Sequence, residues 1–273
     1  MAPNIAVSTS LGSYSPFSDP AVSISYRGRP FDNGLYGRER ADAIRLVRSM
    51  AGYAKFSGDV FIPDVRPANG LVVSQAAYKP TASVTPCAVY VGPKADGVTL
   101  RWRQAALFCT RDCPTVVMCL PHMGLAVAAH AGRQSLLGGP RFESSVVGEM
   151  AKKFSPRDLS RVEVAIVLSV AGERFHHRPD HPVYGPKNRD LIAFVKEAYG
   201  SECFVDEGVG ALSLPMLVKK QCVQAGIRAE KVFHDGIDTY SATLSKGSGY
   251  AFSSHRRGDC RGGNLVFVTV KSC

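Results

Sequence analysis

Two short apolar segments that flank a tight turn form the clearest pattern along the chain. Residues 115–120 and 125–129 are almost entirely apolar, and a Pro-His-Met-Gly tetrapeptide separates them. Short apolar runs joined by turn residues of this kind predict a β-hairpin. A hairpin returns the chain to the place where it began. We therefore expect Cys113, just before the first strand, and His130, directly after the second, to lie within reach of each other.

The rest of the pattern predicts helices and strands that alternate without a regular repeat. Apolar residues at helical spacing predict helices at 39–50, 144–154, 189–199 and 213–226. Short apolar runs bounded by turn residues predict strands at 22–26, 59–62, 71–75, 86–91, 105–109, 162–168, 230–234, 249–254 and 264–270. The His- and Pro-rich segment 172–187 is expected to be irregular. The elements favour an α/β (α+β) fold, with mixed β-sheets flanked by helices.

Length and composition favour one large globular domain. The chain has 273 residues, of which 45% are hydrophobic and 21% charged. Residues 1–20, rich in Ser and Pro, are expected to be a poorly ordered arm, which leaves 21–273 as the domain. No apolar run approaches the ~20 residues of a membrane span, and a signal peptide is not recognisable. Eight scattered cysteines without a CxxC pair indicate free thiols, so we expect a cytoplasmic protein without a membrane partner.

The chain carries an excess of basic residues, 33 Lys and Arg against 23 Asp and Glu, for a net charge of +10. Such an excess attracts phosphate-bearing or acidic partners. An acidic protein and a nucleic acid are both consistent with it. The basic residues are dispersed, and no nucleic-acid-binding motif accompanies them, so the charge alone identifies no partner.

A thiol and an imidazole at one sheet edge have two chemical interpretations and one structural one. They form half of a metal site, or a thiolate–imidazolium pair. Alternatively, Cys113 is a small buried apolar group and His130 a hydrogen-bonded core residue. A catalytic zinc usually has three protein ligands, and no His or Cys spacing identifies the third. The candidates are His122, His176, His177, His181 and His255.

Several motifs, taken in order along the chain, connect this pair to a known family. They lie at 33–37, 95–97, 110–114, 129–132, 212–221, 238–240, 252–257 and 261–263. Together they resemble the laccase-domain family of YfiH-type proteins, also called polyphenol oxidases, from about residue 22 to 270. The resemblance implies a YfiH-like fold, which is similar to that of the cytotoxic necrotizing factor toxins. It also implies phosphorolysis of adenosine- or inosine-type purine nucleosides.

The resemblance further suggests which residues act. Catalytic candidates are Cys113, His130 and Asp112. Candidates for binding the nucleoside and the phosphate are Arg48, Phe175, His255, Arg256 and Arg257. Guanidinium groups match phosphate oxygens well. Zinc on Cys113 and His130 is the expected cofactor. Copper is less favoured because no HxH pair exists, and a metal-free site is the alternative.

Departures from the family pattern keep two other functions open. Ala77 stands where the family has its third metal ligand, a histidine. The Trp of the family's HAGWRG motif is absent, and Ser213 and Asp238 replace a family Asp and a family Cys. One alternative is a metal-free Cys-His deamidase or hydrolase, as in the toxins. The other is a binding module of the same fold without catalytic activity.

Overall fold

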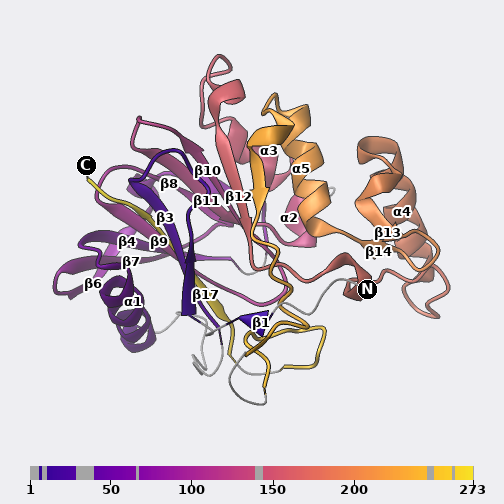
Figure 1. Ribbon diagram of the computed structural model, residues 1–273, viewed down its shortest axis with the longest axis horizontal. Helices are drawn as coiled ribbons and strands as arrows, with labels where there is room; N and C mark the ends of the chain where they lie inside the picture. Colours follow the sequence, from indigo (N-terminus) through magenta and orange to yellow (C-terminus); the bar gives the residue numbers. More distant parts are fainter. Residues whose placement is uncertain are drawn as a thin grey trace.

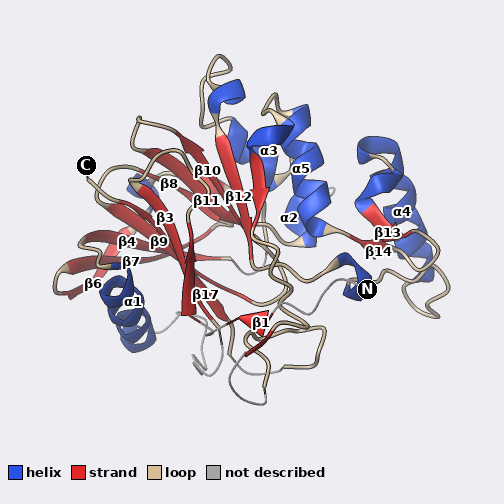
Figure 2. Ribbon diagram, in the orientation of Figure 1, coloured by secondary structure: helices blue, strands red, loops and turns tan. Residues whose placement is uncertain are grey.

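The computed structural model describes residues 6–7, 11–28, 40–65, 68–138, 144–244, 249–259 and 262–272. Two mixed β-sheets lie in the centre of the molecule (Figure 1). Buried apolar side chains of both sheets form a shared core between them. Helices cover the outer face of each sheet (Figure 2). This layered arrangement confirms the prediction of an α/β fold with mixed sheets flanked by helices.

The first sheet has seven strands in the order β2-β3-β17-β9-β4-β7-β6. The strands are β2 (Leu11–Tyr14), β3 (Val22–Arg27), β17 (Asn264–Val270), β9 (Gln104–Thr110), β4 (Gly58–Asp64), β7 (Cys87–Lys94) and β6 (Lys79–Val84). Strand β4 pairs in parallel with β7 and β9, and the other neighbours are antiparallel. Helix α1 (Arg40–Ala54) covers the outer face, where its Leu46 and Met50 share an apolar cluster with Val89 and Phe267.

The second sheet has six strands in the order β15-β12-β10-β11-β8-β5. The strands are β15 (Val232–His234), β12 (Glu163–Val167), β10 (Thr115–Leu120), β11 (Leu125–His130), β8 (Gly97–Leu100) and β5 (Val72–Val73). Strands β15 and β5 pair in parallel with their neighbours. The outer face is covered by α2 (Arg133–Leu137), α3 (Val146–Ala151) and α5 (Leu214–Gln224).

Strands β10, β11 and β12 are apolar on both faces because both faces are covered. In β10, Val116 and Met118 face the helices, whereas Val117 and Cys119 face the seven-stranded sheet. The predicted hairpin is confirmed. Its register pairs Thr115 with His130 at the open end and Leu120 with Leu125 beside the turn.

A smaller subassembly lies to one side of the two sheets. It holds α4 (Gly185–Tyr199) and the short pair β13 (Phe204–Asp206) and β14 (Ala211–Leu212), seen at the right of Figure 1. Strands β1 (Ala6–Val7) and β16 (Thr243–Leu244) form another short pair. The 3-10 turns are η1 (Gln75–Ala77), η2 (Leu159–Arg161), η3 (Gly172–Arg174), η4 (Ser201–Cys203) and η5 (Ala229–Lys231).

The structure departs from the sequence prediction at identifiable places. Strands β6 and β8 were not predicted. The strand predicted at 249–254 is wrong, because Tyr250 forms only an isolated bridge with Thr243. That segment is apolar because Ala251 and Phe252 are buried in the core between the sheets.

Two other boundaries also differ from the prediction. Helix α4 begins at Gly185, within the segment expected to be irregular, because Pro186 suits the first turn of a helix. Leu11–Tyr14 pairs with β3, and Phe17 is buried, so this part of the expected N-terminal arm belongs to the sheet and its core. Among the described residues, no helix combines the length and the apolar character needed to cross a membrane.

Candidate functional site

The hairpin brings Cys113 and His130 together at the open end of β10 and β11. Thr115 is opposite His130, so Cys113 lies one step beyond the last strand pair. A backbone hydrogen bond of 2.8 Å from Ala131 N to Pro114 O holds the two chain segments together. The Cys113 thiol and the His130 imidazole line the same pocket and lie close enough to interact. The sequence prediction that these two residues meet is therefore confirmed.

Gly132 leaves the space that this pair needs. A Cβ atom at this position would lie 2.8 Å from His130 Cε1 and 3.4 Å from Cys113 Sγ. The shorter of these distances is a clash, so a larger residue here would displace the imidazole. The absence of a side chain at Gly132 is thus part of the site geometry.

Asp96 orients the His130 ring through a contact with its Nδ1 atom. Its Oδ1 atom lies 2.9 Å from His130 Nδ1, and its side chain is completely buried. The other oxygen, Oδ2, accepts hydrogen bonds from the backbone of Asn69 and Gly70 and from the hydroxyl of Ser135, at 2.7, 2.6 and 2.9 Å. With Nδ1 engaged, Nε2 is the ring nitrogen left for Cys113 and for a ligand. Sequence analysis included Asp96 only as part of a motif and did not predict this contact, which depends on the pairing of β8 with β11.

The surroundings of His130 favour its protonated form. Burial of the imidazole opposes protonation, but the hydrogen bonds to Asp96 and Cys113, together with the charges of both, outweigh it. They raise the pKa of His130 to about 10. His130 is therefore an imidazolium at neutral pH, and it can donate a proton to a ligand in the site.

The pair opens into a pocket of about 270 Å³, which we call the Cys113 pocket. Its wall contains Phe175, His255 and Arg256 in addition to Cys113 and His130. The Arg256 guanidinium lies 4.5 Å from the centre of the Phe175 ring, a cation–π contact that presents a positive charge on an aromatic surface. Three of the five residues predicted to bind the nucleoside and the phosphate thus meet at the pair.

Asp112 supports this wall. Its Oδ1 accepts a hydrogen bond of 3.0 Å from the Thr239 hydroxyl, and its Oδ2 one of 2.8 Å from the backbone N–H of Arg256. The side chain is only 5% exposed. Both oxygens are therefore engaged in holding the segments 238–240 and 255–257 against the Cys113 turn. The geometry gives Asp112 a positioning role, and a direct catalytic role stays a prediction.

Arg257 and Arg48 do not join the Cys113 pocket. The Arg257 guanidinium donates to the carbonyl oxygens of Tyr240 and Phe252 and to the Asp259 carboxylate. These contacts occupy the Arg257 guanidinium, so it holds the loop and does not bind a phosphate. Arg48 is an exposed residue of α1, and it is not among the described residues that line the Cys113 pocket.

The residues present do not fit a zinc ion held by three protein donors. Ala77 is exposed at the end of η1. In the described part of the chain, no three His, Cys, Asp or Glu side chains come together as a metal site. His122 lies in the turn at the opposite end of the hairpin, and His176 and His181 line a different pocket. Zinc binding at Cys113 and His130 stays a prediction. The reactions proposed below use only side chains of this chain.

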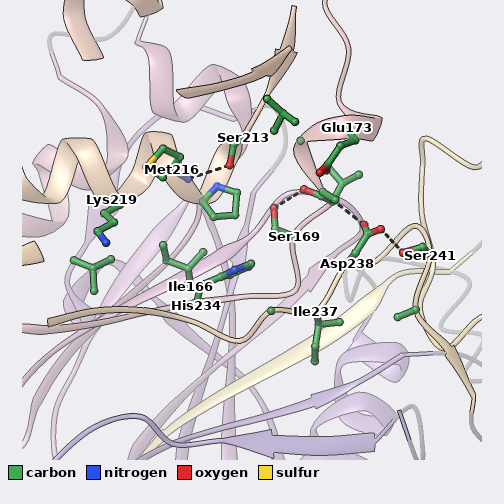
Figure 3. Close-up of a pocket in the computed structure, with 18 residues that line it drawn as sticks. Ile166, Ser169, Glu173, Ser213, Met216, Lys219, His234, Ile237, Asp238 and Ser241 are labelled. Carbon is green, nitrogen blue, oxygen red and sulfur yellow. Dashed lines mark hydrogen bonds between the residues drawn. The ribbon is translucent and has the colours of Figure 1, made fainter. Parts of the chain in front are cut away.

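A separate pocket of about 470 Å³ lies between the ends of β12 and β15, the start of α5 and the segment 236–242 (Figure 3). Its polar groups bond mainly to each other and to the backbone. Asp238 accepts from the backbone N–H of Ala171 and Tyr240 and from the Ser241 hydroxyl. Ser213 caps α5. None of the described residues predicted as site residues lines this pocket.

Comparison with known proteins identifies the family of the chain. A family model described as multi-copper polyphenol oxidoreductase laccase matches residues 61–271. No curated protein matches the chain. Several solved structures share the fold, and three of them are described next.

The first is the hypothetical protein YfiH of Bacillus licheniformis, with a TM-score of 0.67 at 18% identity over 92% of this chain and 93% of that chain. YlmD of Geobacillus stearothermophilus has a TM-score of 0.67 at 19% identity over 99% and 100% of the two chains. Protein NMB0706 of Neisseria meningitidis has a TM-score of 0.64 at 16% identity over 97% and 100%. At these identities the likeness concerns the fold, and it confirms the expectation of a YfiH-like architecture.

Proposed function

This chain belongs to the multi-copper polyphenol oxidoreductase laccase family, and we propose that its Cys113 pocket catalyses the phosphorolysis of purine nucleosides. The observation that carries the proposal is the hydrogen-bonded pair Asp96–His130 beside Cys113, at a pocket walled by Phe175 and Arg256. A laccase reaction needs several metal ions with many His ligands. The described residues bring no three such ligands together.

Each residue has a role in this reaction. Arg256 holds the phosphate nucleophile, because its guanidinium faces the pocket and its charge suits phosphate oxygens. A phosphate oxygen attacks the anomeric carbon of the ribose, and the bond from that carbon to the purine nitrogen breaks. His130 donates its proton to the departing purine. Asp96 and Cys113 keep His130 protonated and correctly oriented until then, and Phe175 provides an apolar surface beside the ligand.

A second candidate is a cysteine-dependent hydrolase or deamidase. A thiol beside an imidazole that is oriented by a carboxylate is the arrangement that activates cysteine nucleophiles. In this reaction the Cys113 sulfur attacks the carbonyl carbon of an amide. His130 passes a proton to the leaving ammonia, and water then hydrolyses the thioester. Within the described ranges no third metal donor joins Cys113 and His130, and this candidate requires none.

The products distinguish the candidates. The purified protein is incubated with inosine or adenosine, with and without phosphate, and in the presence of either zinc or a chelator. Free base and ribose 1-phosphate are measured by chromatography. Release of base that requires phosphate and is lost in Cys113→Ala supports phosphorolysis.

Other products point to the remaining interpretations. Ammonia release from a glutamine peptide, with a covalent adduct on Cys113 detected by mass spectrometry, supports the deamidase. Neither product under any metal condition contradicts both enzymatic proposals and leaves the binding module. Activity that appears only with added zinc contradicts the metal-independent mechanism.

A further inference from the structure

A second pocket, of about 810 Å³, shares the lining residue Arg256 with the Cys113 pocket. We call it the cationic pocket. It is lined by the start of α2, the segment 176–181 and the first turns of α4. Among its lining residues are Arg133, His177, Arg178, Lys187 and Arg256, and no acidic side chain of the described residues lines it. Its electrostatic potential is therefore strongly positive.

Two of these charges form no side-chain ion pair with any described residue. Arg178 forms a paired contact with Asp180, at 3.1 and 2.9 Å. By contrast, no carboxylate among the described residues forms an ion pair with Arg133 or Arg256, and burial lowers the pKa of both guanidinium groups. Two partly desolvated cations that face one pocket repel each other, and a bound anion relieves that repulsion.

His177 provides independent evidence for a ligand. Its side chain is only 3% exposed, and neither ring nitrogen has a hydrogen bond of standard geometry, although the backbone carbonyl oxygens of Gly210 and Phe175 lie close enough to favour its protonated form. Burial, together with the charges of Arg133 and Arg256, lowers its pKa to about 4, so the ring is neutral, with one donor and one acceptor nitrogen. A buried polar group without a partner destabilises the protein. A ligand in the pocket that His177 lines would satisfy it.

The position of His177 is fixed by its neighbours. Its ring packs edge-on against Phe175, with a centroid distance of 4.8 Å and an interplanar angle of 72°. Its backbone N–H donates to Gly210 O at 2.9 Å. The imidazole is thus held at the pocket wall in a single arrangement.

The start of α4 adds to the attraction for an anion. This helix has 15 residues and no acidic residue in its first turn, and Tyr184, Lys187 and Asn188 line the pocket. The partial positive charge of a helix N-terminus therefore adds to the side-chain charges. At the same place the rings of His181 and Tyr184 lie 5.0 Å apart and provide an aromatic surface.

From this arrangement we propose that the cationic pocket binds a phosphate monoester of the size of a nucleoside monophosphate. Arg133 and Arg256 bind the phosphate, and His177 forms a hydrogen bond with the organic part of the ligand. Inorganic phosphate alone would leave most of the 810 Å³ empty, whereas pockets of about 300–1,000 Å³ enclose molecules of nucleotide size. The site is distinct from the Cys113 pocket and shares only Arg256 with it.

Calorimetric titration of the full chain tests this proposal, because it measures binding without turnover. The probes are adenosine 5′-monophosphate, adenosine, inorganic phosphate and a single-stranded oligonucleotide. The variant is Arg133→Gln. The matched control is Arg157→Gln, which removes the same charge from an exposed residue outside the described pockets.

We expect the monophosphate to bind at least about tenfold more tightly than adenosine or phosphate, since only it engages all the groups. Arg133→Gln should weaken it by about tenfold or more, the loss that follows from removing a charged hydrogen bond, and Arg157→Gln should leave it within about twofold. In the nuclear magnetic resonance spectrum, the ring signals of His177 should shift on binding.

Four results would overturn the proposal. These are phosphate binding as tightly as the monophosphate, the oligonucleotide binding more tightly than either, Arg133→Gln weakening binding no more than Arg157→Gln, and His177 ring signals that do not shift. The proposal does not depend on the phosphorolysis assay, since binding is scored whether or not the Cys113 pocket is active.

Discussion

Asp96 Oδ1 lies 2.9 Å from His130 Nδ1, and Asp96 is fully buried beneath that ring. A buried carboxylate in this position sets the tautomer and the orientation of the imidazole and stabilises its protonated form. Both enzymatic candidates need these properties of His130. A substitution of Asp96 therefore tests whether the Cys113 pocket is active.

The first prediction concerns Asp96→Asn. The amide removes the negative charge and can present an N–H to Nδ1, so we expect activity to fall by about 100-fold or more. Stability should fall by ~1–3 kcal/mol, because Oδ2 also accepts three hydrogen bonds. Turnover and urea unfolding measure the two effects. Ser135→Ala is the control, since it removes one bond to Asp96 and leaves the charge, and equal activity losses in the two variants would contradict the prediction.

The second prediction separates Arg256 from its neighbour Arg257. Arg257→Gln should lower the free energy of unfolding by ~2–3 kcal/mol, because its guanidinium holds backbone carbonyl oxygens and Asp259. Arg256→Gln should raise the KM for phosphate and change stability by less than ~1 kcal/mol, since its guanidinium contacts Phe175 and the pocket. Thermal unfolding and steady-state kinetics on both variants give the comparison. The opposite pattern would show that the arginines had been assigned the wrong roles.

The third prediction concerns the buried thiols. Burial raises the pKa of Cys119 and of Cys222 to about 12, so at pH 8 both are neutral thiols shielded from solvent. In the native protein we expect iodoacetamide to leave both unmodified, whereas Cys113 reacts and activity is lost. Peptide mass spectrometry before and after unfolding in urea measures this. Modification of Cys119 in the native state at a rate similar to that of Cys113 would be inconsistent with the structure.

The fourth prediction is a pH dependence of stability at Glu163, which is 4% exposed at the edge of the core. Burial opposes its ionisation, but hydrogen bonds from Lys231 and Ser18 hold its pKa below the ordinary value. A depressed pKa means that the stabilisation is present above the unfolded pKa near 4.5 and is lost as the pH falls through the lower folded value. Glu163→Gln should cost ~1–3 kcal/mol at pH 7 and flatten the stability profile below about pH 5.

Urea unfolding between pH 3 and 7 measures this profile. The exposed Glu230, paired with Arg228, provides the control, and Glu230→Gln should leave the profile close to that of the unchanged protein. A profile for Glu163→Gln that is parallel to that of the unchanged protein would contradict the assignment.

Local sequence was sufficient where the relevant contacts are close along the chain. The hairpin 115–130 and the meeting of Cys113 with His130 were predicted correctly, because a short turn determines which residues of its two strands come together. Helix α5 was also predicted, at 213–226, since helical periodicity depends on neighbouring residues. The fold class followed from the alternation of such elements.

Other features depended on contacts between distant segments. The apolar run at 249–254 was taken for a strand, although it is apolar because it fills the core between the sheets. Arg256 and Arg257 are adjacent and chemically identical, yet one lines the Cys113 pocket and the other binds loop carbonyls. No local pattern distinguishes them, because the conformation of the 252–259 loop decides where each side chain points.

The sequence by itself therefore determined the hairpin, the Cys113–His130 pair, the alternation of strands and helices, and the family to which the chain belongs. Only the tertiary structure decided that Asp96 supports His130, that Asp112 supports the wall, and that Arg133 and His177 share a second pocket. The physical reason is the range of the interactions. Turns, caps and periodicity act over a few residues, whereas pockets and buried hydrogen bonds form where sheet pairing and core packing bring remote segments together.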